Sequence, residues 1–346
     1  MKLDKVRLIG RVMPIEDTLW MVLSGTGVEF QTTGTWAKVT FVADDTWDGP
    51  AENRVRVAVY VDGVRVVDTL LDQPKKEVVA FEEDSPVKHV VRVIKLSEAA
   101  MSTCGIEKIE TDGTMMPTEY KGKFIEFVGD SITCGYGVDD EDKDHHFATG
   151  TEDVTRAYAY KTAERLNADY SMVSFSGYGI VSGYSADGEK MGHQLVPDYY
   201  EKFGFSYGTY LGKYKPQNVF WECSKRQPDV VVVNLGTNDM SYVLDKDERR
   251  EEFIAGYVAF LKVITERNPE ASIVCTLGVM GEALCTAVEE AIKRYEAASN
   301  LQKNISFVGL TNQLPEDGYV ADWHPTETTH GKAAEKLAKA IEAILQ

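Results

Sequence analysis

The sequence predicts an α/β domain with a parallel sheet, preceded by an all-β sandwich domain. Before about residue 110, short runs rich in Val, Ile and Phe follow one another with near-alternating polarity and no convincing helical pattern. Further along, apolar runs alternate with segments of helical periodicity, which is typical of βα units. The chain of 346 residues also exceeds the usual size of one domain. We therefore divide it into a sandwich at 1–110, a linker at 111–122 and an α/β domain at 123–346.

The strands of the first half are predicted from composition and turn signals. Val, Ile and Phe fit the pleated, half-buried surface of a strand, and Asp62-Gly63 is a typical hairpin turn. The predicted strand segments are 36–44, 53–71, 75–81 and 88–97. Thr111-Asp112-Gly113 opens the stretch that we interpret as the linker.

The second half alternates between strands and helices. The predicted strands are 124–128, 170–175, 229–235, 272–277 and 305–310, and the predicted helices are 154–166, 249–267, 282–298 and 330–345. The unbroken run of valines from Val230 to Val233 indicates a strand buried on both faces, as in a parallel sheet. In such sheets the ligand site lies at the carboxyl ends of the strands.

The loop after the first of these strands contains a candidate nucleophile. Residues 124–138 read FIEFVGDSITCGYGV. A phosphate-binding loop is excluded because no Lys lies between Gly129 and Asp142. The nucleophile elbow of α/β-hydrolases needs glycines two residues before and two after the Ser, and Thr133 takes the second place. On this segment alone, Ser131 is either a helix cap or a catalytic nucleophile.

Three further loops supply the other parts that acyl transfer requires. Ser176-Gly177-Tyr178-Gly179 follows the second strand, and Gly236-Thr237-Asn238-Asp239 follows the third. Asp322-Trp323-His324-Pro325 precedes the last helix. Together with Ser131 they offer a hydroxyl, an imidazole, backbone amides and a carboxamide. A serine attacks a carbonyl, a histidine moves the proton, and N–H donors stabilise the oxyanion.

These segments resemble the four sequence blocks of the SGNH (GDSL-type) hydrolases, in the same order and over nearly all of 123–346. With the β-rich first half and the Asp-Trp-His-Pro motif, the chain looks most like carbohydrate esterase family 2. Those enzymes join a jelly-roll domain to a three-layer α/β/α SGNH domain and remove acetyl groups from plant polysaccharides. The resemblance implies an acetyl xylan esterase type of activity without a cofactor. It implies Ser131 as nucleophile and His324 as base, with an oxyanion hole formed by the N–H groups of Ser131 and Gly177 and the amide of Asn238.

The position of the triad carboxylate departs from the family pattern. SGNH enzymes usually place Asp three residues before the His, where this chain has Ala321, whereas Asp322 stands two residues before. Relatives in the esterase family include Ser-His dyads in which a backbone carbonyl replaces the carboxylate. Pro325 favours an extended conformation at His324, and alternate residues of an extended segment point to the same side. We therefore predict Asp322 as the third catalytic residue and keep the carbonyl as the alternative.

Other candidate residues surround this core. Trp323 is predicted to bind substrate, because aromatic faces stack on sugar rings. The acidic stretch 139–146, DDEDKDHH, is either a solvated loop or a site for a divalent cation. We predict the solvated loop and no metal, since ester hydrolysis by Ser and His demands none. The segment 182–217 has no clear periodicity and is expected to form a wall of the pocket.

Charge and cysteine content limit the partners. The net charge of -18 argues against nucleic acid and anionic membranes. The five cysteines include no C-x-x-C pair, which favours free thiols in a reducing compartment. Residues 1–14 contain no apolar stretch that resembles a signal peptide, so we expect a soluble, cytoplasmic protein. The expected partner is an acetylated poly- or oligosaccharide, and a homo-oligomer is left open. The alternatives are a lipase or thioesterase, and a carbohydrate-binding protein with weak catalysis.

Overall fold

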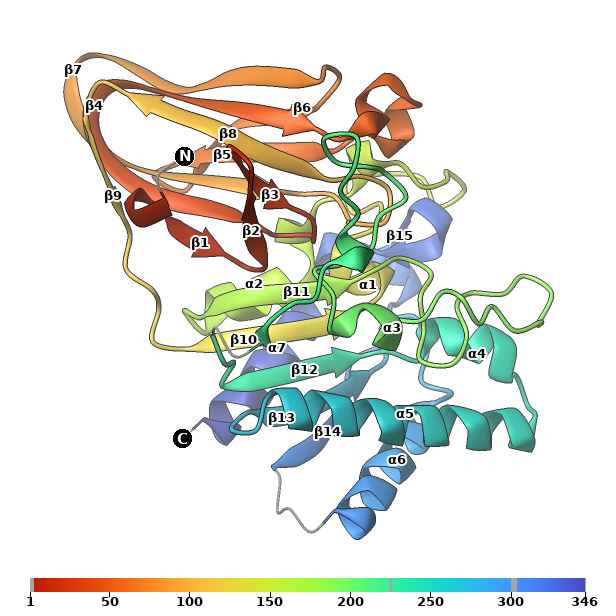
Figure 1. Ribbon diagram of the computed structural model, residues 1–346. Helices are drawn as coiled ribbons and strands as arrows, with labels where there is room; N and C mark the ends of the chain where they lie inside the picture. Colours follow the sequence, from red (N-terminus) through yellow and green to blue (C-terminus); the bar gives the residue numbers. More distant parts are fainter. Residues whose placement is uncertain (1–2, 224–225, 300–303, 346) are drawn as a thin grey trace.

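The computed structural model describes residues 3–223, 226–299 and 304–345 (Figure 1). In this part of the chain, an antiparallel sheet of nine strands comes first, and a parallel sheet of five strands follows. The first sheet consists of β1 (Arg7–Ile9), β2 (Val12–Ile15), β3 (Thr18–Met21), β4 (Gly27–Ala43), β5 (Arg56–Val61), β6 (Val64–Leu70), β7 (Lys75–Lys95), β8 (Cys104–Thr111) and β9 (Thr114–Pro117).

Hydrogen bonds join the first nine strands into one network. The order is β2-β3-β8-β4-β7-β5-β6, and β1 and β9 also pair with the long strand β4. The long strands β4 and β7 bend around a core of their own (Figure 1). A separate, mostly β N-terminal domain is therefore confirmed, whereas the jelly-roll topology stays a prediction.

The predicted linker at 111–122 is wrong in part, because β9 lies within it. Strand β8 pairs with β4 up to Thr111, and β9 resumes the pairing with β4 at Thr114. Between them, the Asp112 carboxylate accepts hydrogen bonds from the backbone N–H groups of Thr35 and Trp36. The Asp-Gly turn signal therefore marks a local interruption of the ladder along β4 rather than the end of the domain.

The second sheet confirms the five predicted strands and their parallel arrangement. Its order is β11-β10-β12-β13-β14, so β10 lies between β11 and β12. The strands are β10 (Phe124–Gly129), β11 (Asp169–Ser174), β12 (Val230–Asn234), β13 (Ser272–Leu277) and β14 (Ile305–Gly309), and a small two-stranded ladder joins β15 (Tyr319–Val320) to β16 (His324–Pro325). From β10 the chain continues to β11 on one side and then returns to β12 on the other side. Such a reversal of the strand order creates the crevice where ligands bind in open α/β sheets.

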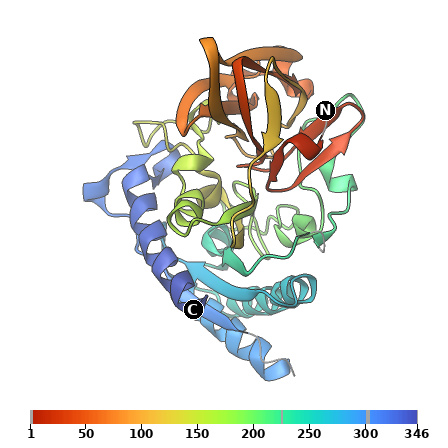
Figure 2. The same ribbon diagram turned by 90° about the vertical axis from the view of Figure 1, so that its left-hand side faces the viewer.

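Helices cover both faces of the parallel sheet. Helices α2 and α7 pack against one face and α5 and α6 against the other (Figure 2). The α-helices are α1 (Ser131–Cys134), α2 (Tyr158–Arg165), α3 (Pro197–Tyr200), α4 (Thr237–Val243), α5 (Asp247–Arg267), α6 (Cys285–Ala298) and α7 (Glu327–Ile344). The 3-10 helices are η1 (Leu3–Lys5), η2 (Asp45–Asp48), η3 (Ala51–Asn53), η4 (Thr149–Thr151), η5 (Val154–Arg156), η6 (Pro216–Asn218), η8 (Pro315–Asp317) and η9 (Ala321–Trp323). No helix in the described ranges is long and apolar enough to cross a bilayer.

The apolar cores cross from one sheet to the other. Trp20, from β3, is fully buried and stacks on Tyr210, from the long loop between β11 and β12, with ring centroids 5.3 Å apart. Ile94 of β7 belongs to the same core as α2 and α7. Buried ion pairs add to this contact, since Arg11 pairs with Glu126 at 3.1 Å. The N-terminal strands thus pack directly against the α/β half of the chain.

Candidate active site

Ser131 lies directly beyond the carboxyl end of β10, at the first position of α1. The N-cap of this short helix is Asp130, whose side chain accepts a hydrogen bond from the backbone N–H of Ile132. Ser131 is therefore not the cap, and its hydroxyl is available for chemistry. Gly135, in the left-handed conformation at φ 80°, ends the helix after one turn. This turn holds the hydroxyl in place at the edge of the sheet.

His324 faces this hydroxyl. The distance from His324 Nε2 to Ser131 Oγ is 2.9 Å, although 193 positions separate the two residues in the chain. The Tyr136 ring stacks on the imidazole, with centroids 3.9 Å apart. Burial lowers the pKa of His324 to about 4, so the ring is neutral at pH 7 and can accept a proton. The hydroxyl and the base predicted from sequence are thus brought together.

The Asp322 carboxylate does not contact the imidazole, and the extended segment on which we based its role is wrong. Asp322 has φ 51° and Trp323 has φ 61°, so both adopt the left-handed conformation within η9. The carboxylate accepts hydrogen bonds from Tyr136 Oη and contacts His146 Nδ1 at 2.9 Å. Two backbone carbonyls, of Ala321 and Asp322, face His324 Nδ1 at 3.2 Å. The alternative kept above, a carbonyl partner, is what the geometry supplies.

Gly177 and Asn238 line the same cleft as Ser131. Gly177 has φ +80°, and a Cβ built there would meet no heavy atom within 4 Å, so glycine is favoured here by the backbone conformation rather than by crowding. The Asn238 Nδ2 group donates to the Tyr178 carbonyl at 2.9 Å. Its second hydrogen has only a long contact, 3.4 Å, with Asp130 Oδ2. Both residues predicted as donors therefore line the cleft together with Ser131.

Two buried carboxyl groups support these loops. Asp239 accepts hydrogen bonds from the backbone N–H groups of Ile180, Val181 and Ser182, which fixes the chain after Gly177. Burial raises the pKa of Asp239 to about 6 and that of Asp130 to about 7. Asp239 therefore ties the loop after Gly177 to the start of α4.

The cleft around Ser131 has a volume of about 710 Å³ and carries aromatic side chains at its rim. Trp323 is half exposed, packs against Tyr319 with centroids 5.2 Å apart, and has Lys143 Nζ 4.6 Å from its ring centre. Tyr184, from the long segment 182–217, lines the cleft and is 61% exposed. Within 182–217, Tyr184 alone lines the cleft, so the segment contributes one side chain there rather than the wall that we predicted.

Two regions of the chain match known protein families. The model of the GDSL-like Lipase/Acylhydrolase family matches residues 127–332. The chain belongs to this family. The model of the Carbohydrate esterase 2 N-terminal domain matches residues 8–118, in front of the family domain.

The chain is similar to several proteins that are named as esterases. It is 33% identical over 223 residues to the cellulase/esterase CelE of Acetivibrio thermocellus, a match that covers 63% of this chain and 25% of that protein. It is 27% identical to an acetylxylan esterase / glucomannan deacetylase of Cellvibrio japonicus, covering 84% of this chain and 76% of the relative. A family two carbohydrate esterase from Clostridium thermocellum, solved in complex with cellohexaose, has a TM-score of 0.85 at 26% identity and covers 98% of this chain and 99% of that chain.

Sequence reasoning missed two residues that contact the base or its neighbour. Tyr136 covers one face of the His324 ring, and His146 contacts Asp322. Tyr136 lies five positions after Ser131 in a glycine-rich turn, where nothing in its spacing pointed to His324. In this member of the family, the acidic loop 139–146 is tied to the site by the His145 carbonyl, which accepts from the Asp322 N–H at 2.9 Å.

Proposed function

We propose that the protein is a serine esterase that removes O-acetyl groups from plant polysaccharides or oligosaccharides. The observation that carries the proposal is the 2.9 Å contact between Ser131 Oγ and His324 Nε2 in an open cleft, beside Gly177 and Asn238. A buried neutral imidazole at this distance is a general base for the hydroxyl. Membership of the GDSL-like family, with the N-terminal match to carbohydrate esterase 2, supports ester hydrolysis as the reaction.

The relatives and the cleft support a carbohydrate as the substrate. Relatives of this chain include an acetylxylan esterase / glucomannan deacetylase, and one solved relative holds cellohexaose. Trp323 and Tyr184 offer two exposed aromatic faces at the rim of the cleft, and such faces suit sugar rings. We assign Trp323 to substrate binding. The match spans a quarter of CelE, so the proposal concerns this chain alone.

The proposed reaction has two half-reactions at Ser131. Ser131 Oγ attacks the acetyl carbonyl while His324 Nε2 takes the hydroxyl proton, which then passes to the leaving sugar oxygen. The N–H groups of Ser131 and Gly177 and the second hydrogen of Asn238 Nδ2 stabilise the oxyanion. Water, activated by His324, then releases acetate from the acyl-enzyme. In both steps the Ala321 and Asp322 carbonyls hold the Nδ1–H of the ring, so we propose a Ser-His dyad.

The dyad leads to a small expected effect at Asp322. Asp322→Asn should lower kcat by less than about tenfold, because the backbone carbonyls that face Nδ1 are unchanged. The carboxylate holds Tyr136 and His146 instead, and an amide oxygen can still accept from the Tyr136 hydroxyl. The measurement is steady-state kinetics on an acetate ester. A loss of about 10⁴-fold, the scale for a triad carboxylate that becomes an amide, would restore Asp322 as the third catalytic residue.

Acyl-chain preference tests the proposed deacetylation. We expect kcat/KM on 4-nitrophenyl esters to fall step by step from acetate to octanoate, by about 10- to 200-fold for each methylene that does not fit, since one misfit methylene is worth ~1–3 kcal/mol. Release of acetate from acetylated xylan, measured in parallel, tests the carbohydrate part. Equal rates on acetate and octanoate esters would contradict the proposal.

One observation favours a second function. Three apolar side chains, Met240, Leu244 and Met280, line the same cleft. Such a lining suits a longer acyl chain, as in a lipase or thioesterase. A kcat/KM that rises from acetate to octanoate would select this alternative. The polar groups of the cleft and the relatives favour the acetyl esterase.

A further inference from the structure

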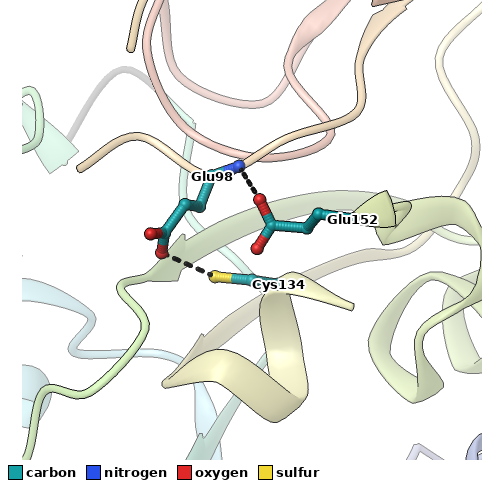
Figure 3. A group of neighbouring side chains, drawn as sticks. All are labelled: Glu98, Cys134 and Glu152. Carbon is teal, nitrogen blue, oxygen red and sulfur yellow. Dashed lines mark hydrogen bonds between the residues drawn. The ribbon is translucent and has the colours of Figure 1, made fainter. Parts of the chain in front are cut away.

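A carboxyl group from the N-terminal half lies directly beneath the candidate active site. Glu98 follows β7 in the chain, and its side chain is fully buried. Its Oε2 atom accepts a hydrogen bond of 2.7 Å from the backbone N–H of Ser176. The Cys134 thiol also points at Oε2, with a distance of 3.8 Å between sulfur and oxygen (Figure 3). Glu98 does not line the cleft, so it does not touch the substrate.

The two partners of Glu98 belong to the segments that carry the proposed chemistry. Ser176 immediately precedes Gly177, whose N–H we assign to the oxyanion hole. Cys134 is the last residue of α1, which begins with Ser131. The Glu98 carboxyl oxygen therefore holds the loop that presents the oxyanion donor by a 2.7 Å hydrogen bond, and its longer contact with Cys134 only places it next to the helix that presents the nucleophile.

The backbone of Glu98 is itself held from two directions. The Glu152 carboxyl accepts from the backbone N–H of Glu98 at 2.6 Å (Figure 3). Lys95 Nζ donates to the carbonyls of Ser97 and Glu98, at 2.6 and 2.7 Å. The side chains of Glu98, Glu152 and Lys95 are fully buried. These contacts hold the Glu98 backbone in place, so that its side chain can in turn fix the position of the Ser176 loop.

Burying the polar atoms of this cluster costs folding free energy, because not all of them have hydrogen-bond partners. Oxygen Oε1 of Glu98 and Oε1 of Glu152 are both buried without a hydrogen-bond partner. Burial raises the pKa of both carboxyl groups. An apolar side chain of similar volume would avoid this cost, but it could not accept from the Ser176 N–H. Backbone N–H groups of Ser176 and Glu98 already bind one oxygen of each carboxyl group, so we do not interpret the cluster as a metal site.

We infer that Glu98 is a positioning residue for the oxyanion hole, supplied by the β-rich N-terminal half. It fixes the Ser176 amide and thereby the direction of the Gly177 N–H relative to Ser131. The inference rests on the proposed function, in which Gly177 donates to the oxyanion. Glu98 matters as a hydrogen-bond acceptor at this position, not as a charge. Displacement of the donor weakens stabilisation of the transition state more than binding of the substrate.

Three variants test this role by kcat and KM on 4-nitrophenyl acetate. Glu98→Gln keeps an acceptor oxygen at the same reach, and we expect kcat within about threefold of wild type, since the amide oxygen can accept from the Ser176 N–H as the carboxyl oxygen does. Glu98→Leu removes the acceptor and should lower kcat by about 10- to 100-fold with little change in KM. Glu98→Asp keeps the carboxyl group but withdraws it by one methylene, and it should lose as much as Glu98→Leu. Cys134→Ala is the matched control: it removes the thiol's contacts with Glu98 and with Ser174 but leaves the hydrogen bond from the Ser176 N–H to Glu98, and it should stay close to wild type.

The order of the variants decides the inference. If Glu98→Leu does not fold, the comparison of Glu98→Gln with Glu98→Asp remains, and melting temperatures show which variants are folded. Equal kcat for the Gln and Asp variants, or a more active Asp variant, would overturn the positioning role. An inactive wild-type protein, or an active Ser131→Ala variant, would instead contradict the proposed function. The two failures are therefore distinguishable.

Discussion

Ser131→Ala should lower kcat on an acetate ester by about 10⁵- to 10⁶-fold, the loss seen when a triad nucleophile is removed. The change deletes the only atom that we propose to form the acyl-enzyme. The fold should be unaffected, because the N-cap of α1 is Asp130 and its hydrogen bond to the Ile132 N–H remains. The melting temperature provides the control for folding.

Covalent labelling tests the assignment of Ser131 as the nucleophile without measuring turnover. An organophosphate ester should label the wild-type protein once, at Ser131, and leave the Ser131→Ala variant unmodified, as judged by the mass of the intact chain. A variant that keeps a tenth of the activity, or a label on another serine, would show that the nucleophile is elsewhere.

His324→Ala should cause a loss of similar size, about 10⁵- to 10⁶-fold in kcat, because the hydroxyl loses the base that takes its proton. The two residues act as one unit, with 2.9 Å between Oγ and Nε2. The double variant Ser131→Ala/His324→Ala should therefore be no less active than either single variant. Kinetics of the four proteins on the same ester measure this coupling.

His146→Ala is the matched control for the base. His146 is also a histidine in contact with Asp322, but its side chain is 89% exposed and it reaches neither the Ser131 hydroxyl nor the His324 ring. It should keep most of the activity. Losses in the Ser131 and His324 single variants that multiply in the double variant would contradict a shared proton transfer, and a His146 variant as inactive as His324→Ala would move the base to the acidic loop.

Much of the fold could be predicted because the second half carries strong local signals. The valine run of β12 is buried throughout, as a strand between two layers of helices must be. Once the sheet is parallel, its carboxyl ends meet at one edge, and the loops with Ser131, Gly177 and Asn238 must approach one another. The contact between Ser131 and His324 follows from topology more than from any single motif.

Other features depend on contacts that no local pattern encodes. Trp323 is a residue type that rarely adopts the left-handed conformation, although Asp does so more often, and Pro325 pointed to an extended segment instead. Tertiary contacts override that preference, since the Asp322 N–H donates to the His145 carbonyl and its carboxylate contacts Tyr136. Likewise, 78 positions separate Glu98 from Ser176, and Glu98 lies in the half of the chain that we assigned to the sandwich.

The shared cores described above have a consequence for how such a protein can evolve. Trp20 stacks on Tyr210 across the two halves, and Arg11 pairs with Glu126 in a buried position. Contacts between domains in one chain are usually polar and smaller, which lets domains be exchanged by recombination. In this protein, an N-terminal half taken from another chain would need side chains that pack against Tyr210 and pair with Glu126. We therefore expect substitutions at this boundary to be inherited in pairs, and the two halves to diverge as one unit.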